Sequence, residues 1–123
     1  MNNNKTQFDD KDIFEHDGYR LAFARTKYTS NNSTAIEVII VDDNNTPVED
    51  FGSLSINLED YGIINTEKAI AINHDFMIDS LKPIVDEFIG RYGTGKTLNI
   101  IYGYASSIFV EIKEISELKE LIM

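Results

Sequence analysis

The octapeptide GRYGTGKT, residues 90–97, is the stretch of this chain whose residue types and spacing most clearly suggest a chemistry. It fits G-x-x-x-x-G-K-[ST], a loop whose backbone amides hold nucleotide phosphates while its lysine reaches the terminal ones. Such a loop follows a strand and opens a helix, since the positive end of that helix attracts phosphate. The motif therefore predicts ATP or GTP binding only where the neighbouring elements come in that order.

The neighbouring elements are expected in the opposite order. Five apolar residues ahead of the glycines recur at the spacing of one helical face: Leu81, Ile84, Val85, Phe88 and Ile89. They predict a helix over 80–90, capped by Asp79 or Ser80, with Pro83 in its first turn and Gly90 and Gly93 at its end. The residues after the glycines, 97–104, alternate as a strand does. A loop at the end of a helix presents carbonyls, which repel phosphate, so nucleotide binding through 90–97 is the disfavoured interpretation.

The other residues that could do chemistry form no convincing site. The chain has no cysteine, and His16 and His74 are its two histidines. The segment DDNNTPVED, 42–50, offers oxygens to a calcium ion but lacks the glycine and glutamate of a helical calcium loop, so an Asx-rich turn is expected. We therefore predict no catalytic, cofactor-binding or metal-binding residue, and no enzyme activity.

Net charge limits the choice of partners. The sequence holds 21 Asp and Glu against 11 Lys and Arg, a formal charge of −10. A field of this sign repels nucleic acid and anionic membranes but attracts a basic protein surface. The first residues are polar, with no apolar core of a signal peptide, and no apolar run approaches 18 residues. A cytoplasmic location is expected.

The acidic residues fall into three groups along the chain. The candidate protein-binding residues are Asp9, Asp10, Asp12, Asp42, Asp43, Glu49, Asp50, Glu59 and Asp60. Joined in one patch, their carboxylates could imitate the phosphates of a nucleic acid and occupy the basic channel of a partner. Alternate turns of a meander lie at opposite ends of a sheet, so the sequence leaves open whether the groups meet.

The remaining patterns predict an α+β fold. Residues 1–7 are expected to be disordered and 8–123 to form a single domain. Strands are predicted over 18–28, half-buried, and over 34–41, 48–58, 68–73, 97–104 and 106–114. The first three should form an antiparallel meander. We expect an antiparallel sheet of about five strands packed against the main helix 80–90, with short helical pieces at both termini, including one from Ile115 to Ile122.

One resemblance bears on function. The strand LSINL, 54–58, followed by AIAIN, 69–73, a helix, glycines and a terminal hairpin, resembles a family of uncharacterised small proteins carried on conjugative elements, plasmids and phages of low-GC bacteria. The resemblance covers roughly residues 18–113 and implies no catalytic residues. Small acidic proteins of such elements are similar to anti-CRISPR and anti-restriction inhibitors.

Two functions follow as hypotheses. The first is a non-enzymatic inhibitor of a host nucleic-acid-handling defence enzyme, acting through its carboxylates on a basic surface. The alternative is a structural or accessory protein of a mobile element that forms a homo-oligomer. In the alternative, an exposed edge strand such as 68–73 would join subunits by sheet extension.

Overall fold

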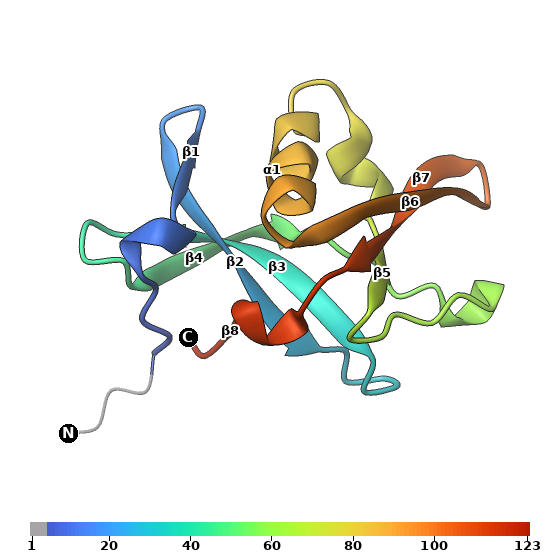
Figure 1. The fold of residues 1–123 in the computed structure, drawn as a ribbon, viewed down its shortest axis with the longest axis horizontal. Helices are drawn as coiled ribbons and strands as arrows, with labels where there is room; N and C mark the ends of the chain where they lie inside the picture. Colours follow the sequence, from blue (N-terminus) through green and yellow to red (C-terminus); the bar gives the residue numbers. More distant parts are fainter. Residues whose placement is uncertain (1–4) are drawn as a thin grey trace.

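Two sheets and one α-helix build the protein in the computed structural model, which describes residues 5–123 (Figure 1). The first sheet has the order β1-β2-β3-β4, and β8 pairs with β2. Its strands are β1 (Phe14–His16), β2 (Tyr19–Lys27), β3 (Thr34–Val41), β4 (Pro47–Ser53) and β8 (Lys119–Glu120). The second sheet has the order β5-β7-β6, with β5 (Ala69–Ala71), β6 (Gly93–Tyr102) and β7 (Ala105–Ile112). Helix α1 (Lys82–Tyr92) lies between β5 and β6 in the chain. The α+β class is confirmed.

The predicted meander of β2, β3 and β4 is present, with antiparallel pairs such as Ala22 with Ile39 and Val38 with Gly52. The expectation of a half-buried β2 was wrong, because its middle is buried on both faces. Leu21 and Phe23 face the main core, whereas Ala22 and Ala24 face a second, smaller one. Small side chains on that second face leave room for a covering segment.

The two chain ends provide that cover. Phe8 and Leu121 pack against Ala22 and Ala24. The Thr6 amide donates to the Ile122 carbonyl at 2.8 Å, and Thr6 Oγ1 accepts from the Ile122 amide at 2.7 Å. Disorder was expected over 1–7. Residues 1–4 lie outside the described part of the chain, whereas Thr6 is buried and bonded.

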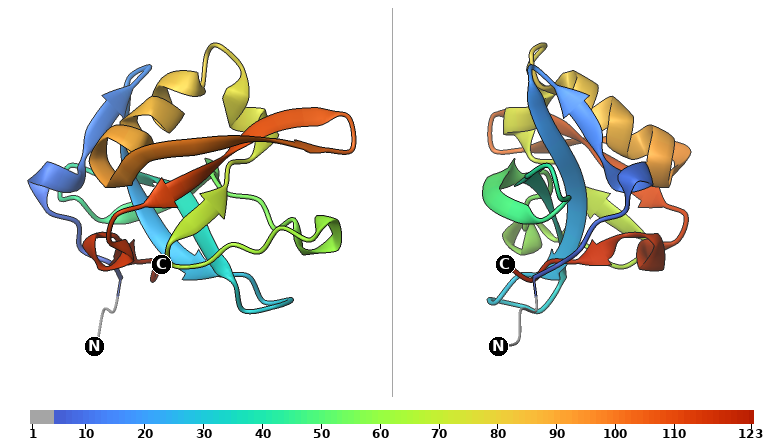
Figure 2. Two further views of the ribbon diagram at one scale, coloured as in Figure 1. Left: turned by 45° about the vertical axis from the view of Figure 1, so that its right-hand side comes forward. Right: turned by 90° about the vertical axis from the view of Figure 1, so that its left-hand side faces the viewer.

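Helix α1 lies against the sheets (Figure 2), and its apolar stripe forms part of the main core. Ile84, Val85 and Phe88 are fully buried, and the Phe88 ring meets that of Phe23 at 5.1 Å. The predicted stripe is thus core, with Leu81 and Ile89 at its margin. The helix runs two residues later than expected. Neither Asp79 nor Ser80 caps it, since Leu81 is the N-cap and its own amide bonds to the Ile78 carbonyl in a preceding turn.

The expected single sheet divides in two just after β4. The strand predicted over 48–58 ends at Ser53, and the next residues change partners. The Leu54 amide donates to the Ile36 carbonyl of β3, whereas the Ile56 amide donates to the Ala71 carbonyl of β5. This short segment therefore links the sheets, and the main core fills the space between them.

The short helical pieces expected near the two termini are present as 3-10 turns, Asp10–Asp12 and Ile115–Glu117, but the C-terminal one does not extend to Ile122. A single 3-10 turn, Ile115–Glu117, leads into β8, which runs parallel to β2. Arg25 explains why this segment is a strand rather than a helix. Its Nε donates to the Leu118 carbonyl and its own carbonyl accepts from the Leu121 amide, both at 2.9 Å. The part of the β2 edge that β1 leaves unpaired thus supplies hydrogen bonds to the C-terminal segment. In a helix, that segment would have made its hydrogen bonds internally. No helix within 5–123 is long and apolar enough to cross a bilayer.

Candidate protein-binding surface

The octapeptide 90–97 spans the end of α1 and the start of β6. Gly90, Arg91 and Tyr92 form the last turn of the helix, and the Gly93 amide donates back to the Ile89 carbonyl. The chain then enters an antiparallel ladder with β7. Helix precedes strand, as expected, so the neighbouring helix end is the one with free carbonyls and partial negative charge. Gly90 remains inside the helix rather than ending it, and Gly93 is its C-cap.

The turn between β3 and β4 is held by an aspartate. Asp42 Oδ1 accepts from the amides of Asn44 at 2.8 Å and Thr46 at 3.0 Å. This is the Asx-rich turn that the sequence predicted in place of a calcium loop. In residues 5–123, no three His, Asp or Glu side chains gather as a metal site would require. The Asp42 carboxylate is therefore an internal brace of the turn, and its neighbour Asp43 projects into solvent.

Asn45 joins this turn to the first acidic group. Its Nδ2 donates to Asp10 Oδ1 at 2.7 Å, and its Oδ1 accepts from an Arg20 guanidinium nitrogen at 2.9 Å. Its carbonyl accepts from the Phe8 amide at 3.1 Å. Two of the three acidic groups therefore meet in the fold, because the segment around Asp10 and the turn at Asp42 lie side by side.

Not every predicted acid is available on this surface. Asp12 is buried, and its Oδ2 accepts from Lys119 Nζ at 2.8 Å. Asp9 pairs with the same ammonium at 3.1 Å. By contrast, Asp10, Asp43 and Glu49 are exposed and take part in no ion pair within the described residues. We call these three, with Asp42, the acidic end of the protein.

The third acidic group lies elsewhere. Glu59 and Asp60 are exposed on a 3-10 turn, Glu59–Tyr61, whose Tyr61 ring meets Tyr102 of β6 at 6.1 Å. Along the longest axis of the molecule this turn and the β3–β4 turn occupy opposite sides (Figure 1). Glu59 and Asp60 therefore do not belong to the acidic end.

Asp50 takes part in a carboxyl pair that sequence reasoning missed. Its carboxyl group interacts with that of Glu37 on the adjacent strand β3, a residue that is only 9% exposed. Ser53 Oγ lies 2.9 and 2.8 Å from the two Glu37 carboxyl oxygens. Burial, and then the Asp50 carboxyl group, raise the pKa of Glu37 to about 7. The sequence signal was a single acid within the apolar strand TAIEVIIV, which we interpreted only as a buried strand.

This pair predicts a particular pH dependence of stability. Glu37 has a folded pKa of about 7 against an ordinary 4.5, so the folded state binds more protons between these values. Its contribution to stability therefore falls as pH rises from 4.5 to 7, by roughly 2 kcal/mol once solvent screening is allowed for. Urea unfolding at pH 5 and pH 8 should show a smaller decline for Glu37→Gln than for the parent protein. Glu49→Gln, which removes an exposed carboxylate, should keep the parent decline; equal declines in all three would refute the assignment.

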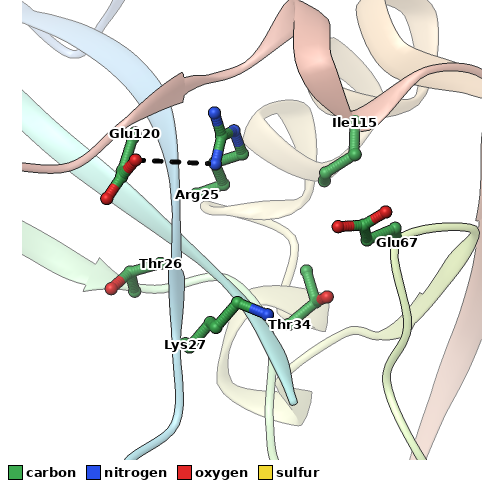
Figure 3. A pocket seen from close by; sticks show the side chains of 7 residues that line it. All are labelled: Arg25, Thr26, Lys27, Thr34, Glu67, Ile115 and Glu120. Carbon is green, nitrogen blue, oxygen red and sulfur yellow. Dashed lines mark ion pairs between the residues drawn. The ribbon is translucent and has the colours of Figure 1, made fainter. Parts of the chain in front are cut away.

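A pocket of about 250 Å³ opens at the far end of β2 (Figure 3). Glu120 lies beside Arg25, Glu67 lies across from them, and Lys27 and Ile115 also line the pocket. Arg25 is already engaged with Glu120 at 3.9 Å and with the Leu118 carbonyl. Two cations and two carboxylates offset each other here, so the pocket has no preference for an anionic or a cationic ligand.

Comparison of the chain with protein-family models, with curated proteins and with solved structures gives no match. Function is therefore inferred from the arrangement of the acidic residues in the fold.

Proposed function

We propose that this is a non-enzymatic acidic binding protein of a phage or mobile element, which inhibits a host nucleic-acid-handling defence enzyme of the CRISPR or restriction type. The acidic end would occupy the basic surface on which that enzyme holds DNA or RNA. The observation that supports this most directly is the Asn45 bridge, which sets two acidic segments, far apart in sequence, beside each other.

Charge and rigidity support the same proposal. Arg20, the cation in contact with this bridge, is occupied by Asn45 and by the Asp42 carbonyl, so it is drawn into the turn. Asp43 and Glu49 are left exposed on a hairpin whose turn is braced by Asp42. Carboxylates held on an ordered backbone lose less conformational entropy on binding than those of a flexible tail. Binding of this kind acts strongly on the rate of encounter and weakens with salt.

Charge reversal at the acidic end tests the proposal. Guide-loaded CRISPR nucleases and restriction enzymes would be incubated with the protein, and DNA loading followed by gel shift. We expect the parent protein to block loading by at least one of these enzymes. The double variant Asp43→Lys and Glu49→Lys should raise the concentration needed for half-inhibition by about tenfold, since attraction becomes repulsion at two positions.

A matched control separates this surface from net charge. The double variant Glu59→Lys and Asp60→Lys changes the charge by the same amount on a turn at the opposite side of the molecule. It should inhibit nearly as well as the parent. Equal loss in both double variants would show that only overall charge matters. Full inhibition by the Asp43 and Glu49 variant would remove the acidic end from the mechanism.

A further inference from the structure

Strand β6 is a long, open sheet edge. It is the outer member of the order β5-β7-β6, and no strand within residues 5–123 pairs with its other side. After an irregularity between Gly93 and Thr97, it pairs without interruption from Thr97 with Val110 to Tyr102 with Ala105. A row of unpaired amides and carbonyls on such an edge is a template for another strand.

The edge is also apolar. Leu98 is 65% exposed and Ile101 is 74% exposed, in a strand whose only charged residue is Lys96. Sheet edges in proteins are usually protected by charges, prolines or short length. Strand β4, the outer strand of the first sheet, follows that rule, since it starts at Pro47 and exposes Glu49 and Asp50. Because the edge of β6 has no such protection, we expect another polypeptide to cover it.

The edge expected from the sequence to join subunits, 68–73, is not free. The Ala71 amide of β5 donates to Asn65 Oδ1 at 2.8 Å, and the Ala71 carbonyl accepts from the Ile56 amide at 3.0 Å. The Ala69 carbonyl accepts from the Thr66 amide. The segment before β5 thus occupies its outer side, and β6 is the edge of this sheet that remains open.

Charge distribution identifies the occupant. Residues 88–110, which include β6 and most of β7, contain no Asp or Glu in a chain that has 21 of them. Two copies, each of formal charge −10, repel each other through most of their surface. A stretch without carboxylates lets a second copy approach with little repulsion, whereas a basic partner would gain nothing there.

We propose that two copies pair through β6, antiparallel about a two-fold axis, to form one continuous six-stranded sheet from two three-stranded ones. A register centred on Asn99 gives self-complementary neighbours. It sets Leu98 opposite Ile100 of the partner subunit, and Asn99 opposite Asn99 of the partner subunit. The two Lys96 residues then lie about 20 Å apart, at 3.3 Å per residue. This inference does not depend on the proposed inhibitory function.

Light scattering after size-exclusion chromatography tests the dimer over a range of about 1–500 µM. We expect the mass of the parent protein to rise from the monomer value of 14.0 kDa towards twice that value with concentration. Raising the salt concentration should favour the dimer, because it screens the repulsion between two acidic copies. A parent protein that remains monomeric throughout this range would overturn the proposal, whatever else binds the edge.

Substitution at the two-fold axis tests the register. Asn99→Asp places two carboxylates opposite each other and should weaken the dimer at pH 7 at least about tenfold. Mixing Asn99→Asp with Asn99→Lys should restore a dimer, since the opposed charges then differ in sign. Val48→Asp, on the edge strand β4, is the matched control and should leave dimerisation unchanged. A dimer that persists in Asn99→Asp, fails to return in the mixture, or is lost equally in Val48→Asp would contradict pairing through β6.

Discussion

Replacing Phe88 by alanine is expected to lower the free energy of unfolding by about 3–5 kcal/mol. Phe88 is 0% exposed and stands where α1 meets the first sheet. Its ring lies 5.1 Å from that of Phe23 and 5.5 Å from that of Tyr92, so the substitution leaves a cavity among aromatic neighbours that cannot close around it. Urea unfolding followed by circular dichroism would measure the change.

Tyr104 supplies the matched control for this prediction. It lies on the tight turn between β6 and β7 and is 108% exposed, so Tyr104→Ala also deletes a large aromatic ring but opens no cavity. It should change stability by less than about 0.5 kcal/mol. If the two alanine variants unfolded at similar urea concentrations, Phe88 would not be a centre of the core. Both variants are compared at low micromolar concentration, so that dissociation of the dimer proposed above does not contribute to the measured unfolding.

The elements that the sequence predicted well are those specified by nearby residues. The central strand β3 has an apolar run on both faces, and the helical stripe of α1 repeats at its own period, so neighbouring positions alone identify both. The β6–β7 hairpin is likewise marked by Gly103, whose φ is +60°. The register of this hairpin follows because its tight turn permits little else.

The arrangement that the sequence did not predict depends on contacts between distant residues. Nothing near Leu54 indicates that its neighbours leave β3 for β5, and nothing near Leu118 indicates that an apolar C-terminal pattern ends beside Arg25. An apolar spacing that suits a helix also suits a segment that covers a sheet face. In this protein the edge of β2 decides between the two, 93 residues away from Leu118.

The candidate site shows the same limit. Acidic residues were easily found in the sequence, but their availability depends on partners elsewhere in the chain. Lys119 neutralises the buried Asp12 from 107 positions away, and Asn45 connects Asp10 to the β3–β4 turn. Counting carboxylates therefore overestimates the surface, since it includes groups that serve the interior.

Asn45→Ala is the variant expected to disrupt the acidic end, with a loss of about 2–4 kcal/mol in the free energy of unfolding. Asn45 is buried and has a φ of +63°, a left-handed conformation that costs alanine about 1 kcal/mol. The variant also loses the hydrogen bonds to Asp10 and Arg20, each of which contributes about 0.5–1.5 kcal/mol. The two contributions can be measured separately.

Two further variants separate backbone strain from hydrogen bonding. Asn45→Gly keeps the left-handed backbone without strain, so it should recover about 1 kcal/mol of the loss. Asn32→Ala is the matched control, because Asn32 has a similar φ of +62° but is exposed. It should cost only about 1 kcal/mol for the same strain. If Asn45→Ala proved no more destabilising than Asn32→Ala, the Asn45 side chain would not hold the two acidic segments together. The acidic end would then lack the rigidity on which its proposed role in binding depends.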